Sequence, residues 1–102
     1  MSEIAKLAQT ISERASADPT SSWTAKLLAK GPEKCAEKFG EEAVEAIIAA
    51  VKDDKDELVK ESADVLFHLL VMLQSRGVSL SQVEAELAHR AGTSGIAEKA
   101  SR

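Results

Sequence analysis

Two acidic pairs with helical spacing, separated by a short polar turn, constrain the fold of this chain more than any other feature. The first pair is Glu42 and Glu45, and the second is Glu61 and Asp64. Side chains three residues apart project from one side of an α-helix, so each pair predicts an acidic patch on a helix. The short connection lets the two helices fold back antiparallel, with all four carboxylates facing each other. Such a cluster repels itself unless a cation binds or some groups stay protonated, and a hard ion such as Mg2+ is the natural occupant.

A single acidic pair at this spacing is usually no more than a solvated helix surface. Here both pairs adjoin strongly apolar neighbours, where carboxylates without a partner are costly. This setting strengthens the case for a metal site, with a solvated surface as the alternative.

The composition indicates one all-α domain. Of the 102 residues, 44% are hydrophobic but only 3% are aromatic, so aliphatic side chains and alanine must fill the core. Ala, Glu, Lys and Leu are abundant and there are only two prolines, which is typical of helices. We expect a single domain over residues 1–92 and a loose, polar tail over residues 93–102.

Charge and apolar patterning exclude several classes of function. With a net charge of −4 and no basic surface, nucleic-acid binding is not expected, although a nucleotide can still bind as a metal complex. Cys35 is the single cysteine, so an intrachain disulfide is excluded and a reducing cytosol fits. We find no signal-peptide pattern, and the longest apolar run, residues 65–73, is too short to cross a bilayer. A cytoplasmic protein without membrane contact is expected.

Apolar periodicity and capping residues predict an antiparallel bundle of four to five helices. Ser2 and Ser79 are suitable N-caps, Gly31 and Gly77 are suitable helix stops, and Pro32 suits a first helical position. The predicted helices span residues 3–15, 23–30, 32–53, 55–76 and 79–91.

The helix predicted over residues 32–53 is apolar on two faces. At about 100° per residue, the face that should pack inside the domain carries Cys35, Phe39, Ala43, Ala46 and Ala50. Val44, Ile48 and Val51 lie nearly opposite. A helix that is apolar on two faces is buried on both. Because so short a chain hardly covers the second face, a homodimer is predicted.

The same region contains residues suited to phosphoanhydride hydrolysis. Glu41, at the edge of the cluster, is placed to orient or deprotonate the attacking water, which a divalent ion would activate. Lys34 and Lys38 lie one turn apart and are candidates for holding phosphate oxygens. Trp23 is expected to pack against its loop, with stacking on a base as the alternative. His68 is expected to be a core histidine, or to support the metal ligands without binding the metal itself.

Longer motifs resemble a known enzyme family. Glu41-Glu42-x-x-Glu45 followed by Glu61-x-x-Asp64 resembles the signature of the all-α nucleoside triphosphate pyrophosphohydrolases, which include the MazG-type enzymes. The segments 22–28, 38–42, 63–70 and 94–102 are more closely similar to phosphoribosyl-ATP pyrophosphohydrolases of histidine biosynthesis. The similarity extends over nearly the whole chain.

This resemblance implies a MazG-like fold, a homodimer and a reaction that requires Mg2+, with Mn2+ as the alternative ion. Phosphoribosyl-ATP and water would give phosphoribosyl-AMP and pyrophosphate, a step of L-histidine biosynthesis. The implied metal ligands are Glu42, Glu45, Glu61 and Asp64, and the implied catalytic residues are Glu41, Glu42 and Lys38. Some MazG-type enzymes have a lysine where this chain has Glu57.

Two alternatives to this function remain open. One is a house-cleaning enzyme that hydrolyses ordinary or damaged nucleoside triphosphates. The other is a helical dimer without enzymatic activity that binds a cation or a partner protein.

Overall fold

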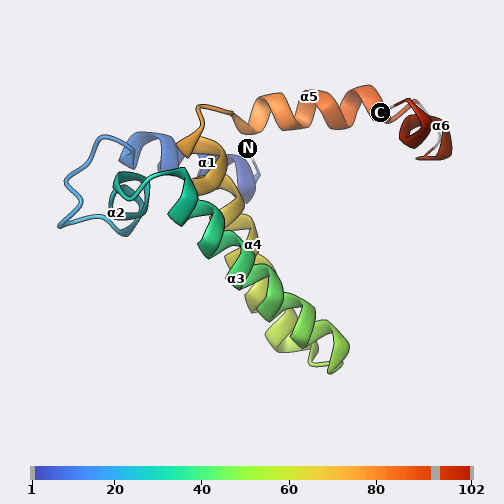
Figure 1. Cartoon of the computed structure of the whole chain (residues 1–102), viewed down its shortest axis with the longest axis horizontal. Coiled ribbons are helices and arrows are strands. Elements are labelled where there is room, and N and C mark those ends of the chain that lie inside the picture. The colour runs from blue at the N-terminus through green and yellow to red at the C-terminus, as the bar shows by residue number, and fades with distance from the viewer. Residues whose placement is uncertain (1, 93–94, 102) are drawn as a thin grey trace.

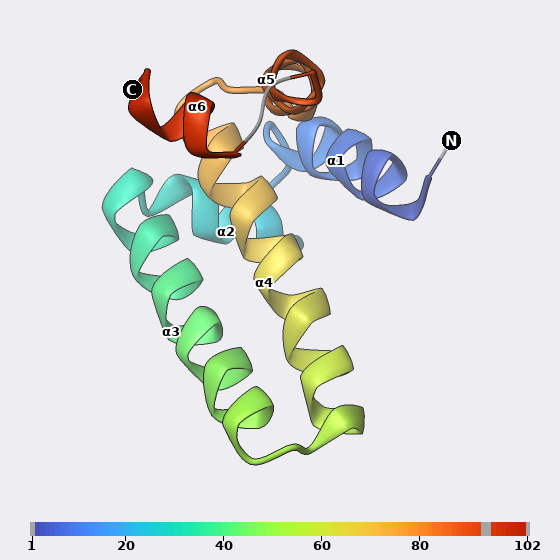
Figure 2. The ribbon, with the colours of Figure 1, turned by 90° about the vertical axis from the view of Figure 1, so that its right-hand side faces the viewer.

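A long helical hairpin organises the structure. The computed structural model describes residues 2–92 and 95–101, and this part of the chain is all-α, as predicted. Its helices are α1 (Glu3–Arg14), α2 (Trp23–Ala29), α3 (Pro32–Val51), α4 (Lys55–Ser75), α5 (Leu80–Arg90) and α6 (Gly95–Ala100). The antiparallel helices α3 and α4 make the most extensive contact (Figure 2). α1 and α2 lie at the end of the hairpin away from its turn, and α5 extends away from it (Figure 1). No helix in the described residues is long and apolar enough to cross a membrane.

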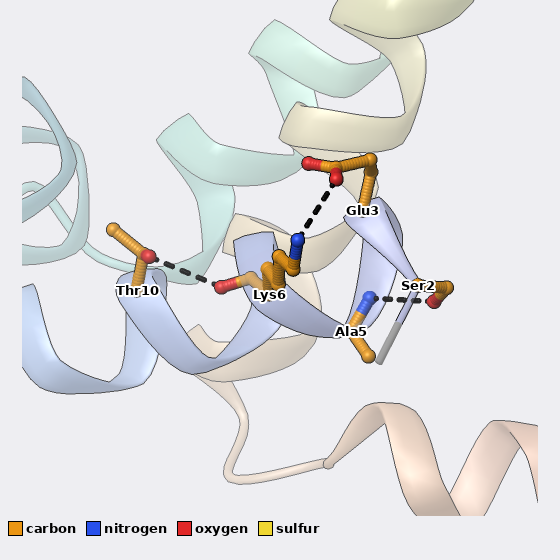
Figure 3. Close-up of polar contacts among 5 residues, drawn as sticks. All are labelled: Ser2, Glu3, Ala5, Lys6 and Thr10. Carbon is orange, nitrogen blue, oxygen red and sulfur yellow. Dashed lines mark hydrogen bonds and ion pairs between the residues drawn. The ribbon is translucent and has the colours of Figure 1, made fainter.

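Two helices, α1 and α5, start at the N-caps that the sequence predicts. The Ser2 hydroxyl accepts a hydrogen bond from the backbone N–H of Ala5 at 3.1 Å, and Lys6 pairs with Glu3 at 3.0 Å on the next turn (Figure 3). Ser79 forms a complete capping box at the start of α5. Each cap satisfies an N–H group that the first helical turn leaves without a partner.

The turn between α3 and α4 is tight because Asp53 adopts a left-handed conformation, with φ of +57°. The N–H of Asp54 donates to the Ala49 carbonyl at 3.0 Å, and the N–H of Asp53 donates to the Ala50 carbonyl at 3.1 Å. This arrangement is a Schellman motif, which ends one helix and reverses the chain. The Asp54 side chain then caps α4 by accepting from the N–H of Glu57. The short reversal fixes which turns of α3 and α4 face each other.

The core lies at the end of the hairpin that α1 and α2 cover. Its fully buried members are aliphatic or small, in line with the low aromatic content, and they are Ile11, Leu27, Cys35, Leu70 and Val71. Cys35 fills a small space and its thiol donates to the Leu27 carbonyl at 3.4 Å. Burying one large aliphatic side chain contributes roughly 1.5–3 kcal/mol, so these buried residues stabilise this end of the hairpin.

Two details differ from the predictions. Ala49 rather than Ala50 is buried on the inner face of α3, whereas Ala50 is exposed. The contact line with α4 runs through Cys35 and Ala49 at multiples of seven residues, and such a line drifts by about 20° per heptad around a straight helix. The prediction for Ala50 is therefore wrong. The tail that was expected to be loose forms α6 from Gly95, whereas residues 93 and 94 lie outside the described part of the chain.

Candidate metal centre

Three carboxylates meet where α3 and α4 face each other, about midway along the hairpin. Glu42 from α3 and Glu61 and Asp64 from α4 each offer a carboxylate oxygen, and these oxygens all lie within 4.8 Å of one another. Glu42 and Glu61 are half-buried, and Asp64 is exposed. The spacing of three residues places the two α4 carboxylates on one side, and the tight turn brings Glu42 opposite them. The structure thus brings together three of the four metal ligands predicted from the sequence.

Glu61 occupies the least favourable setting for a charged group in this cluster. Its Oε2 atom is buried and has no hydrogen-bond partner among the described residues. A hydrogen bond shared with Glu57, burial and nearby negative charges raise the pKa of Glu61 to about 7. The nearby charges are those of Glu57, Asp64 and Glu42. Near neutral pH a proton on Glu61 relieves part of this repulsion, and a bound cation would relieve it in the same way.

The donor set fits a divalent cation that prefers oxygen ligands. Two oxygens bound to one Mg2+ ion lie at most about 4.2 Å apart, because each Mg–O distance is about 2.1 Å. The spread of up to 4.8 Å among Glu42, Glu61 and Asp64 closes to that value with small side-chain rotations. A cation would also give the buried Oε2 atom of Glu61 the partner that it lacks. The residues present therefore fit the ion that the sequence predicts.

Glu45, predicted as a fourth ligand, lies outside this three-carboxylate group and is exposed. It follows Glu42 by three residues, which rotates its side chain by about 60° around α3 relative to Glu42. The line along which α3 contacts α4 runs from Glu42 toward Ala49, so Glu45 lies to one side of it. Its role as a ligand stays a prediction.

The two lysines expected to hold phosphate are paired with carboxylates on their own helix. Lys38 Nζ lies 3.1 Å from Glu41 Oε2, and Lys34 Nζ lies 3.4 Å from Glu37 Oε1. The hydrogen bond and charge of Glu41 raise the pKa of Lys38, and Lys38 in turn lowers the pKa of Glu41. Solvent-exposed ion pairs contribute little to stability, so phosphate oxygens can replace these carboxylates at little cost. While it is paired with Lys38, Glu41 is a weaker base than a free carboxylate. Its role in orienting or deprotonating water stays a prediction.

His68 and Trp23 have contrasting surroundings. His68 lies one turn after Asp64 on α4 and is only 7% exposed, as expected of a core histidine. Its ring packs edge-to-face on Phe67, with the centroids 5.0 Å apart, but its Nδ1 atom has no hydrogen-bond partner in the part of the chain that the structure describes. Trp23 begins α2 with more than half of its surface exposed, so its ring is accessible to a ligand.

Glu57 influences the site although the sequence analysis gave it no role. It precedes Glu61 by one turn of α4 and is the largest cause of the raised pKa of that residue. The spacing of four residues was the available signal, because like charges at this distance on a helix repel each other.

Comparison with known protein families gives a match over most of the chain. The sequence model of the phosphoribosyl-ATP pyrophosphohydrolase family matches residues 4–91. The chain belongs to this family.

Curated relatives match over the full length. The phosphoribosyl-ATP pyrophosphatase of Rhodobacter capsulatus is 71% identical over 102 residues, which cover 100% of this chain and 99% of that protein. The protein of the same name from Ruegeria pomeroyi is 71% identical and covers 100% of this chain and 97% of its own length. That of Dinoroseobacter shibae is 70% identical and covers 100% of both chains. The family resemblance predicted from the motifs is confirmed.

Proposed function

We propose that this chain hydrolyses phosphoribosyl-ATP to phosphoribosyl-AMP and pyrophosphate, a step of L-histidine biosynthesis. The observation that carries the proposal is the group of three carboxylate oxygens within 4.8 Å, one from α3 and two from α4, in a member of this family. Its relatives at about 70% identity are named phosphoribosyl-ATP pyrophosphatase, which supports the same substrate for this chain.

The products require that the bond between the α- and β-phosphates breaks and that water is divided between the two fragments. Glu42, Glu61 and Asp64, with Glu45 as the further proposed ligand, would hold Mg2+, or Mn2+ in its place. The bound ion would supply charge neutralisation at phosphate and a lower pKa for the attacking water. Lys38 and Lys34 exchange their carboxylate partners for phosphate oxygens and so hold the substrate. Glu41, released by Lys38, orients or deprotonates the attacking water. Stacking of the exposed Trp23 ring on the base stays a prediction.

A pyrophosphate-release assay with Mg2+ tests the function. Phosphoribosyl-ATP and a panel of nucleoside triphosphates are compared at equal concentrations. We expect release from phosphoribosyl-ATP at a much higher kcat/KM than from any triphosphate in the panel. Preference for ordinary or damaged triphosphates would instead assign the house-cleaning activity, and release from none of them would leave a protein that only binds.

The metal is tested separately through stability. A ligand that binds only the native state raises the free energy of unfolding, by about 2.7 kcal/mol at 100 times its dissociation constant. Mg2+ or Mn2+ should therefore raise the melting temperature, and Glu42→Gln should lose most of that gain. The control is Glu33→Gln, an exposed change on the same helix that should keep it. An equal gain in Glu42→Gln would show that the ion binds elsewhere.

We also propose a homodimer formed through the outer face of α3. Val44, Ile48 and Val51 are exposed, and Ile47 extends the same surface. The radius of gyration is 15.4 Å, compared with about 13 Å for a compact domain of this length. A symmetric partner is the commonest cover for such a patch, because each subunit presents the same surface to the other.

The cytoplasmic location predicted from the sequence belongs to the same proposal. A free, buried cysteine suits a reducing compartment, and Cys35 is such a residue.

A further inference from the structure

A basic segment directly precedes the carboxylate cluster in a chain that is acidic overall. Residues 23–38 carry four lysines and two glutamates, whereas the net charge of the chain is −4. The lysines recur at every fourth residue, and two of them, Lys34 and Lys38, lie on α3. The helix α3 contains no other lysine or arginine. Positive charge beside a metal site attracts a substrate whose anionic groups extend beyond the metal.

Lys34, Lys38 and Glu42 form one strip along α3, which we call the lysine strip. The lysines precede Glu42 by eight and four residues, so they are rotated from it by about 80° and 40° around the helix and lie about 12 and 6 Å from it along the axis. Lys34 pairs with Glu37 at 3.4 Å and Lys38 pairs with Glu41 at 3.1 Å, each three residues later. The two positive charges therefore follow one another along the strip, with that of Lys38 nearer the cluster.

Arg76 is also a cation at the end of the hairpin away from its turn, but it lies on another side of α3. It lines a groove together with Glu33 and Ala36. Glu33 precedes Glu42 by nine residues, which is a rotation of about 180° around the helix. A substrate that extends from the cluster along the lysine strip therefore meets Lys38 and then Lys34, and not Arg76.

Phosphoribosyl-ATP carries anionic groups at two separate places. Its triphosphate contains the bond that breaks, so the α- and β-phosphates belong at the carboxylate cluster. The phosphoribosyl group adds a second ribose and a further phosphate, which ATP lacks. Adenosine and this ribose separate the further phosphate from the triphosphate by more than one helical turn of about 5.4 Å. A cation one turn from Glu42 suits the triphosphate, and a cation two turns away suits the further phosphate.

We infer that Lys34 binds the phosphate of the phosphoribosyl group, whereas Lys38 binds the triphosphate. Lys34 is then a specificity-determining residue, because it contacts the part of the substrate that ordinary nucleoside triphosphates lack. The inference rests on the function proposed above and assigns its two lysines to different phosphates. A phosphate monoester carries about −1.5 to −2 charges near neutral pH, so it can displace the single charge of Glu37 as the partner of Lys34.

Selectivity between phosphoribosyl-ATP and ATP tests this assignment. We measure kcat/KM for pyrophosphate release from both substrates, with Mg2+, in the full-length wild type and its variants. Lys34→Gln should lower the value for phosphoribosyl-ATP about 10- to 100-fold more than the value for ATP, as for the loss of one hydrogen bond between charged groups. Lys34→Arg, which keeps the positive charge, should retain most of the preference. Lys38→Gln should lower both values by similar factors, and the control Arg76→Gln should leave their ratio unchanged.

Binding without turnover provides a second readout. Phosphoribosyl-AMP and AMP differ by the same phosphoribosyl group, and the ratio of their affinities, measured by titration, should fall about 10- to 100-fold in Lys34→Gln. Equal losses for the two substrates, or an unchanged ratio of affinities, would overturn the inference. So would a loss of preference in Arg76→Gln, because the further phosphate would then bind in the groove beside Glu33. A wild type that prefers neither substrate would refute the proposed function itself.

Discussion

The two halves of the α3–α4 hairpin differ in what covers them. The half that contains the start of α3 packs against α1 and α2 and buries Leu27 and Val71 completely. The half next to the turn has no other helix of the described chain beside it (Figures 1 and 2), and there Val51 is 82% and Val59 is 71% exposed. Both halves are rich in aliphatic residues, yet only the half that packs against α1 and α2 forms a core within the chain. We call it the covered half, and the half next to the turn the bare half.

This difference shows how the candidate site is held. The carboxylates of Glu42, Glu61 and Asp64 lie where the covered half ends. The covered half fixes the two helices relative to each other, and the bare half leaves Asp64 exposed and Glu42 and Glu61 half-buried. The boundary is therefore where repulsive charges can be kept close without being sealed from solvent.

The largest expected effect is a loss of activity on substitution of the carboxylates at the boundary between the two halves. Glu61→Gln or Asp64→Asn should lower kcat/KM by at least about 100-fold, because the charge stabilisation supplied by a metal amounts to several kcal/mol and each 1.36 kcal/mol is a factor of ten. The metal-free melting temperature should stay the same or rise, since a repulsive charge is removed. Glu33→Gln in the exposed first turn of α3 is the control and should retain activity. Near-normal turnover in either cluster variant would remove that residue from the metal site.

In the covered half, the next largest effect concerns stability. Leu27 on α2 is fully buried, so Leu27→Ala should lower the free energy of unfolding by about 2–5 kcal/mol. The control is Lys26→Ala on the same helix, an exposed change that should stay within about 0.5 kcal/mol of the wild type. Urea denaturation of both variants measures the difference. A cost below about 1 kcal/mol for Leu27→Ala would mean that the covered half is less well packed than described.

Much of the fold could be predicted because its signals are local. Ser2, Asp54 and Ser79 cap helices through contacts within three residues, and such contacts can be recognised from spacing alone. The assignment of Ala50 to the inner face failed because the contact line depends on how α4 crosses α3, which no local pattern specifies. The helix α6 was missed because its six residues are too few to show a period.

The site could be predicted only in part for the same reason. The grouping of Glu42 with Glu61 and Asp64 follows from helical spacing and a short turn. The unpaired Nδ1 of His68 and the pKa of Glu61 depend on burial between helices and on Glu57, and these appear only when the side chains are packed.

A substitution in the bare half should change the oligomeric state. Ile48→Asp places a charge on the outer face of α3 and removes an apolar side chain whose full burial contributes roughly 1.5–3 kcal/mol per subunit. We expect the variant to sediment as a monomer under conditions in which the wild type is a dimer. Ile4→Asp on α1 is a matched control, because Ile4 is 41% and Ile48 is 46% exposed in one chain. A monomeric wild type, or an Ile48→Asp dimer of unchanged affinity, would show that α3 does not carry the interface.

The smallest effect is a pH dependence that originates at the boundary between the halves. The pKa of Glu61 is raised from 4.5 to about 7 in the folded, metal-free protein, first by the hydrogen bond shared with Glu57 and then by burial and neighbouring charges. A carboxyl group with a raised folded pKa contributes its full stability below the unfolded pKa, and this contribution is lost as pH rises through the folded value. The metal-free melting temperature of the wild type should therefore fall relative to that of Glu61→Gln between about pH 5 and pH 8, because only the wild type loses this proton. Comparison with the variant removes the contribution of His68, whose lowered pKa acts with the opposite sign. Saturating Mg2+ should abolish the difference in slope by replacing the proton at Glu61, and parallel melting curves for the two metal-free proteins would mean that Glu61 stays ionised across this range.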